Sequence, residues 1–146
     1  MSSVTDVSVE GVLAASAFER LYEALRRLTP RDGLSLTAAS TLRRLERRGP
    51  HRLCALHVAE GVTQPAMTQL VSRLERDGLA TRGPDPHDRR VVVVTITGAG
   101  RTLLEQRRAR CTAALADVLD GLATPDRAAI MAALPAMERL AEVITE

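Results

Sequence analysis

Residues 63–77 carry amide, hydroxyl and guanidinium side chains at the spacing of one face of a helix. Apolar residues at i, i+3, i+4 and i+7 predict that the other face of this helix is buried. These apolar residues are Met67, Leu70, Val71 and Leu74. The side chains expected to face outward are Pro65, Thr68, Gln69, Ser72, Arg73 and Arg76. Because amides and guanidinium groups pair with base edges and phosphates, this face is suited to contacts with nucleic acid.

Both ends of this helix are marked in the sequence. Thr63 is a suitable N-cap, Pro65 falls in the first turn, and Gly78 can adopt the left-handed conformation that ends a helix. Another helix is predicted at about residues 54–60, separated from it only by a short turn containing Gly61. Two helices joined in this way are the sequence form of a helix-turn-helix.

A second arginine-bearing feature follows the helix. Residues 79–82 and 90–96 are rich in strand-forming types, and the segment 83–88 is dense in turn formers. Two prolines in this segment restrict the backbone and reduce the entropy lost when it is ordered. The sequence therefore predicts a β-hairpin whose stiff tip presents Arg89 and Arg90 and could enter a groove.

The elements that must position these features are mostly helical. Apolar stripes predict a helix within residues 11–29 and another over 37–48, followed by an extended piece at 50–53. Thr97 is expected to cap the first of two long helices predicted within residues 98–145. The predicted fold class is mainly α with a small β-hairpin.

Cys111 and Pro135, in these last two helices, each carry a prediction. Cys111 lies within an apolar stripe at helical spacing and is expected in the core. Arg107, Arg108 and Arg110 lie between the stripe residues of the same helix. Pro135 is expected to kink the final helix, because it removes one backbone donor.

Composition limits the class of partner. The net charge is only +2 and all 20 basic residues are arginine, which favours bidentate contacts but equally fits a bias in genomic base composition. Phe18 and Tyr22 are the only aromatic residues, so stacking on single strands is not expected. There is no apolar run of about 18 residues and no signal peptide at residues 1–10, so we expect one cytoplasmic domain with free thiols and no cofactor.

One arginine run has two readings. Residues of the 37–48 helix that are expected to point outward include Arg43, Arg44, Arg47 and Arg48. The run could contact DNA phosphates, but charged runs on helices usually face water, and we favour that reading.

Together these residues resemble the MarR family of winged helix-turn-helix regulators. The resemblance covers nearly all of the chain, and its most specific parts are Gly61–Thr68, Leu74–Leu79 and Asp85–Arg90. The Asp-x-Arg of the family's wing corresponds to Asp88 and Arg90, and its Leu-Thr to residues 96–97, where isoleucine replaces leucine.

The resemblance implies a single MarR-type domain over residues 1–146. It implies dimerisation helices at 11–29 and 98–145, and a winged-helix DNA-binding lobe at 36–97. The helix at 63–77 would enter the major groove and Arg90 the minor groove, with Asp88 orienting that arginine; an ordinary turn salt bridge is the alternative for this pair. The implied DNA-binding residues are Thr63, Gln64, Pro65, Thr68, Gln69, Ser72, Arg73, Arg76, Asp88, Arg89 and Arg90.

The implied function is that of a sequence-specific regulator of transcription that binds double-stranded DNA. The family's usual mode is a homodimeric repressor released by a small anionic or phenolic ligand. A two-fold dimer would read a pseudo-palindromic operator with half-sites about one DNA turn apart. Within it, Gln69 could pair with adenine, and Arg73 or Arg76 with guanine or phosphate.

Cys54 and His57 depart from the family pattern and carry an alternative. Cys54 is expected where a Ser or Thr cap often starts the helix, and a thiol there near Arg52 could be oxidised. Cys54 and His57 also recur with His51 and Glu60 every three residues, which could suit a metal-responsive site, although the register drifts around a helix. We favour a small buried hydrophobe with a histidine packed beside it.

Two further function classes receive little support. The three histidines, His51, His57 and His87, form no triad pattern, and there is neither a phosphate loop nor a glycine elbow, so an enzyme is not expected. A winged helix used only for protein contacts would bind DNA with little salt dependence, whereas duplex binding weakens steeply with salt.

Overall fold

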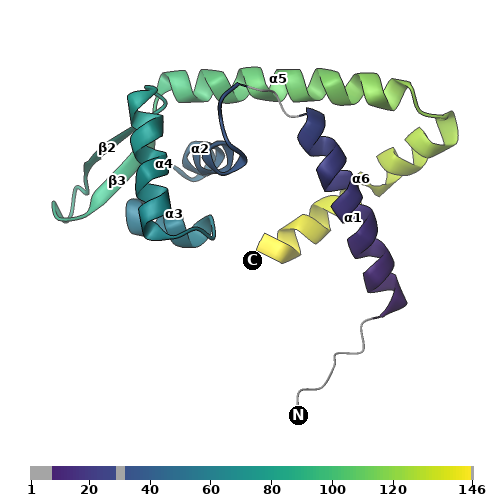
Figure 1. Cartoon of the computed structure of the whole chain (residues 1–146), viewed down its shortest axis with the longest axis horizontal. Coiled ribbons are helices and arrows are strands. Elements are labelled where there is room, and N and C mark those ends of the chain that lie inside the picture. Colours follow the sequence, from purple (N-terminus) through teal and green to yellow (C-terminus); the bar gives the residue numbers. More distant parts are fainter. Residues whose placement is uncertain (1–7, 29–31, 146) are drawn as a thin grey trace, which may run out of the picture. The chain divides into compact units, whose positions relative to one another are not determined.

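The computed structural model describes residues 8–28 and 32–145, and it divides the chain into two compact units (Figure 1). Residues 30–109 form one of them, called here the central unit, and residues 1–29 with 110–146 form the terminal unit. The helix α5, Gly98–Asp120, belongs to both.

The central unit contains the helix-turn-helix and the hairpin predicted from the sequence. Its first helix is α2 (Leu36–Arg48), and α3 (Leu53–Ala59) and α4 (Gln64–Arg76) follow with a short turn between them. The strands β2 (Ala80–Pro84) and β3 (Val92–Ile96) then lead into α5. A mainly helical winged helix-turn-helix fold is therefore confirmed.

A third strand extends the predicted hairpin into a sheet. The strand β1 (His51–Arg52) lies in the piece predicted only as extended, and it pairs antiparallel with β3 in the order β1-β3-β2. Arg52 stands opposite Val93, which stands opposite Gly83 of β2. Two residues are too few to show alternation of apolar and polar types, so the sequence could not reveal this pairing.

The core of the central unit is formed where α2, α3 and α4 meet the sheet. The apolar stripe predicted for α4 is buried throughout, and Met67 and Val71 have no exposed surface. Leu42 of α2, Leu56 of α3 and Val94 of β3 are equally buried and belong to the same cluster. Burial of this stripe fixes which side of α4 faces outward.

The start of α5 is held against the end of α4. Thr97 accepts a hydrogen bond from Gly100 N–H at 3.1 Å, which confirms the predicted cap, and it donates to Gly78 O at 2.6 Å. A Cβ added at Gly100 would lie 2.3 Å from the carbonyl oxygen of Leu79. Only glycine therefore allows the backbones of α5 and of the segment after α4 to approach this closely.

A buried ion pair joins α5 to the segment before α2. Arg107 Nη1 lies 2.6 Å from Asp32 Oδ1, and the two side chains are only 5% and 6% exposed. Burial raises the pKa of the Asp32 carboxyl, but hydrogen bonds from Arg107 and the Leu34 N–H outweigh it, so the pKa lies below its ordinary value. The position of Arg107 between stripe residues gave no sign of this partner.

The terminal unit exposes much of its apolar surface. It contains α1 (Val9–Leu28), the rest of α5, and α6 (Thr124–Thr145), which continues through Pro135. No residue of α1 is buried, and Tyr22 stands 56% exposed on it. Cys111, predicted to be a core residue, is only half-buried.

The helices also bear on membrane insertion. Nowhere in residues 8–28 or 32–145 does a helix combine the length and apolarity needed to cross a bilayer. The kink predicted at Pro135 stays a prediction.

The contact at Gly100 predicts a glycine-specific position. We expect Gly100→Ala to lower the free energy of unfolding by about 1–3 kcal/mol, because the new methyl group meets a backbone oxygen. Gly98→Ala, in open space in the same helix turn, should be neutral or stabilising by up to about 1 kcal/mol. Urea denaturation of both variants measures the difference, and equal effects would contradict the close approach.

The Asp32 pair predicts a pH-dependent stability difference. Asp32→Asn leaves Arg107 buried without its counter-charge and should cost about 2–3 kcal/mol at pH 7. Because the folded pKa of Asp32 lies below the unfolded value, its contribution is complete at neutral pH and is lost as the pH falls through that lowered pKa. The gap between wild type and variant should therefore narrow between about pH 5 and pH 3. A difference in the free energy of unfolding that stays constant across this range would contradict the pair. Glu105→Gln, at an exposed position of α5, serves as the control.

Candidate nucleic-acid interface

The ends of α4 are built as the sequence predicted. Thr63 is the N-cap and its hydroxyl accepts a hydrogen bond from Ala66 N–H at 3.3 Å. Pro65 lies in the first turn, and Gly78 follows the helix with φ +72°. These features define the length of the helix and hence which side chains its outer face presents.

The outer face of α4 presents amides and guanidinium groups to the solvent. Its exposed members are Gln64, Pro65, Gln69, Arg73 and Arg76. Thr68 and Ser72 are half-buried, and each hydroxyl donates to the carbonyl four residues before it at 2.9 Å. These two hydroxyls can therefore act only as acceptors toward a ligand, unless they give up those bonds.

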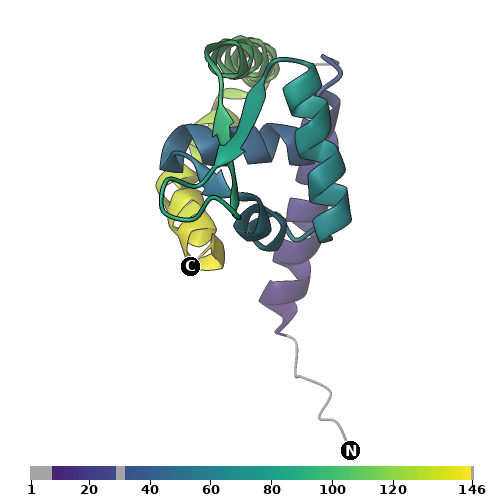
Figure 2. The same cartoon turned by 90° about the vertical axis from the view of Figure 1, so that its left-hand side faces the viewer.

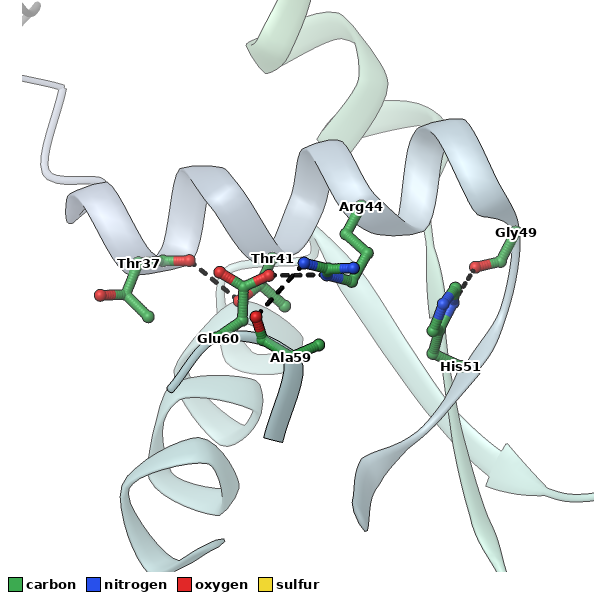
Figure 3. A network of polar contacts seen from close by, with 7 residues as sticks. All are labelled: Thr37, Thr41, Arg44, Gly49, His51, Ala59 and Glu60. Carbon is green, nitrogen blue, oxygen red and sulfur yellow. Dashed lines mark hydrogen bonds and ion pairs between the residues drawn. The ribbon is translucent and has the colours of Figure 1, made fainter. Parts of the chain in front are cut away.

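The helix before α4 is fastened by an arginine (Figure 3). Arg44 of α2 donates through Nε to Glu60 Oε1 at 2.8 Å and through Nη2 to Ala59 O at 3.3 Å. The Glu60 side chain is only 6% exposed, so this pair anchors the turn between α3 and α4 to α2. The Thr41 hydroxyl on the same helix is satisfied by Thr37 O at 2.9 Å.

The favoured reading of the arginine run is wrong for two of its members. Arg44 is tied to Glu60 as described, and Arg43 is half-buried. Burial, followed by the charge of Arg107, lowers the pKa of Arg43 from its usual value. Arg47 and Arg48 are exposed, as predicted.

The hairpin tip is shaped by two aspartates. Asp85, a nearly buried residue, accepts a hydrogen bond from His87 N–H at 2.8 Å, and its own N–H donates to Val91 O at 2.9 Å. Asp88 accepts from the backbone N–H of Arg90 at 3.0 Å, so its carboxylate orders the tip backbone. Arg89 and Arg90 are both exposed there.

The hairpin is fastened to α4 by a pair that sequence reasoning missed. Arg82 of β2 donates its backbone N–H to Glu75 Oε1 at 3.1 Å and its Nε to Glu75 Oε2 at 2.9 Å. Hydrogen bonds from the Arg82 side chain and backbone lower the pKa of the Glu75 carboxyl. The pair crosses a glycine turn where no periodicity links the partners, so no pattern could have indicated it.

The outer face of α4 and the arginine-bearing tip therefore belong to one braced unit. The views of Figures 1 and 2 agree that α4 and the hairpin lie side by side, and Glu75 and Arg82 join them. An exposed helix face beside a protruding hairpin can contact a groove and the adjacent backbone of a duplex at the same time.

The predictions for Cys54 and its neighbours have a mixed outcome. Arg52 is the N-cap of α3, so Cys54 lies inside the first turn and not at the cap. Cys54 is exposed, so the favoured prediction of a small buried hydrophobe is wrong. His51 Nδ1 lies 2.8 Å from Gly49 O (Figure 3), and His57 Nδ1 lies 3.3 Å from Val62 O. In the part of the chain that the structure describes, no three His, Cys, Asp or Glu residues are grouped to hold a metal ion. Oxidation of Cys54 stays a prediction.

Comparison with known proteins agrees with this geometry. A family model described as "MarR family" matches residues 34–92, which contain α2, the helix-turn-helix and most of the hairpin. An uncharacterised HTH-type transcriptional regulator of Mycobacterium leprae is 36% identical over 95 residues, covering 64% of this chain and 66% of that protein. Residues 34–92 of this chain thus match the MarR family. The match with the M. leprae relative spans just under two thirds of that protein's length.

Solved structures extend the likeness over most of the chain. The transcriptional regulator Tm0710 from Thermotoga maritima is 28% identical with a TM-score of 0.66, covering 87% of this chain and 95% of that one. BpsR from Bordetella bronchiseptica is 26% identical with a TM-score of 0.60, covering 94% and 98% of the two chains. The BpsR structure was described as a mechanism for regulation of its DNA binding by 6-hydroxynicotinic acid.

The Arg44 anchor predicts that two arginines of α2 contribute differently to the free energy of unfolding. Arg44→Ala removes the partner of a nearly buried carboxylate and should lower the free energy of unfolding by about 1–3 kcal/mol. Arg48→Ala, an exposed position of the same helix, should change it by less than about 0.5 kcal/mol. Thermal and urea denaturation measure both, and similar values for the two variants would contradict the anchor.

Proposed function

We propose that this protein is a sequence-specific regulator of transcription that binds double-stranded DNA as a homodimer. It acts in the cytoplasm as a repressor. The observation that carries the proposal is the bracing of α4 and the hairpin by Glu75 and Arg82, which holds two arginine-bearing surfaces in one arrangement. No catalytic role is proposed.

The proposed binding mode uses the outer face of α4 in the major groove. Gln69, at the centre of that face, is suited to adenine, and Arg73 and Arg76 to guanine or phosphate. Arg90 enters the adjacent minor groove, while Asp88 holds the backbone of the tip. The remaining contacts, to sugar and phosphate, are assigned to Thr63, Gln64, Pro65, Thr68, Ser72 and Arg89.

The proposed dimer uses the terminal unit. Large apolar residues are exposed along α1, α5 and α6, and the exposure of many such residues is typical of a protein interface. Representative members are Leu21, Leu25, Val118, Ile130, Met137 and Leu140. A two-fold pair would present two copies of α4 to half-sites about one helical turn apart on a pseudo-palindromic operator.

The proposed control is by a small anionic or phenolic ligand. BpsR, whose DNA binding is regulated by 6-hydroxynicotinic acid, supports this class of ligand for a relative with the same fold. Such a ligand changes DNA affinity only if it binds differently to the DNA-competent and incompetent arrangements of the dimer. Release of DNA on ligand binding is the expected direction.

Arg90→Ala tests the binding mode. Loss of an arginine that reaches a groove should weaken binding to a selected duplex by about 5-fold to 100-fold without dissociating the dimer or lowering its melting temperature. Arg48→Ala removes the same charge from an exposed site on α2 and should have a much smaller effect. Fluorescence anisotropy on a duplex recovered by selection from random DNA provides the measurement.

The same selection tests the function itself. The recovered motif should be pseudo-palindromic, and affinity should fall steeply with salt concentration. A monomeric protein, or one with no preference among duplexes at moderate ionic strength, would overturn the proposal. Binding with little salt dependence would instead support a winged helix used for protein contacts.

A further inference from the structure

An acidic residue lies where the proposed function expects DNA phosphates to approach. Asp85 opens the hairpin tip, four and five residues before Arg89 and Arg90, and its side chain is 9% exposed. A carboxylate beside phosphates opposes binding through charge repulsion. Its presence therefore calls for a compensating role within the tip.

Asp85 has a partner at the far edge of the sheet. Its Oδ2 accepts a hydrogen bond from Arg52 Nε at 3.0 Å, although Arg52 belongs to β1, and β3 lies between β1 and β2. Arg52, Val93 and Gly83 form one row across the three strands, and Asp85 follows Gly83 by two residues. Side chains two residues apart share a face of a sheet, so the Arg52 side chain reaches over this face to the tip.

The other oxygen of Asp85 binds the backbone of the tip. Oδ1 accepts from His87 N–H at 2.8 Å, and Asp85 N–H donates to Val91 O at 2.9 Å, one residue after Arg90. The bond from His87 N–H and that from Arg52 lower the pKa of Asp85 despite the opposing effect of burial, so the carboxylate is charged at neutral pH. One charged group therefore connects both sides of the tip to β1.

We infer that Arg52 and Asp85 form a brace that sets the position of the tip, and that Asp85 is a positioning residue for the DNA contacts of Arg89 and Arg90. This inference rests on the proposed DNA-binding function. The Arg52 guanidinium also neutralises the Asp85 charge, which limits the repulsion that the carboxylate exerts on the duplex.

Asp85→Asn distinguishes the brace from simple charge repulsion, because the two predict opposite changes in DNA affinity. The amide can still accept the His87 N–H bond but no longer attracts Arg52 as a charge. Removal of a negative charge alone should tighten DNA binding, whereas loss of the brace should weaken it. We expect binding of the full-length protein to the selected duplex to weaken by about 5-fold to 10-fold at fixed salt.

Asp120→Asn is the matched control, since it removes one carboxylate from an exposed ion pair with Arg127 in the terminal unit. It should leave affinity unchanged or slightly increase it. In a protein that already carries Arg90→Ala, Asp85→Asn should lower the affinity for the duplex by less than about twofold, because the brace acts largely through that arginine.

Variants of Arg52 provide a second test of the brace. Arg52→Gln should weaken binding as Asp85→Asn does, Arg52→Lys should retain most of the affinity, and combining Arg52→Gln with Asp85→Asn should add little. If Asp85→Asn unfolds below the assay temperature, Arg52→Gln takes its place, and its effect on affinity is compared in the presence and absence of Arg90→Ala.

The outcomes are distinct. Wild-type protein that binds no duplex overturns the proposed function, and the brace with it. Wild-type protein that binds while Asp85→Asn binds as tightly or more tightly overturns the brace alone. An equal loss from Asp85→Asn in the presence and absence of Arg90→Ala shows a general structural role and also overturns it.

Discussion

Burial of one side of α4 is the constraint on which the rest of the central unit depends. Met67 and Val71 are fully covered and Leu74 nearly so, and each such side chain contributes about 1.5–3 kcal/mol when removed from water. A helix that rotates about its axis would expose this stripe. The outward direction of Gln69 and Arg73 is therefore set by apolar packing, without any contact of their own.

Polar ties then set the neighbours of α4 relative to it. Glu75 binds both the backbone and the side chain of Arg82, which fixes the base of the hairpin. On the other side, Arg44 fixes the turn that precedes α4 through Glu60. Some arginines, such as Arg44 and Arg107, are bound to acidic residues and largely covered, whereas Arg73 and Arg90 are exposed.

Features that depend on local pattern were predictable from the sequence. The stripe and ends of α4, the order of the helices and the cap at Thr97 all follow from spacing and residue type within one element. Features that depend on two distant segments were not. The partners of Arg44, Arg82 and Arg107 are separated from them by 16, 7 and 75 residues, and nothing in a helical stripe distinguishes a bound arginine from a solvated one. The proposed DNA-binding residues follow from the resemblance and from their exposure.

The near absence of aromatic residues has a spectroscopic consequence. The chain has no tryptophan and a single tyrosine, Tyr22, which stands exposed on α1 with the Arg26 guanidinium 5.8 Å from its ring centre. Intrinsic ultraviolet emission of the protein therefore originates almost entirely from α1. The central unit is optically silent in that range, so a change in emission reports on the surroundings of the terminal helices and not on melting of the winged helix.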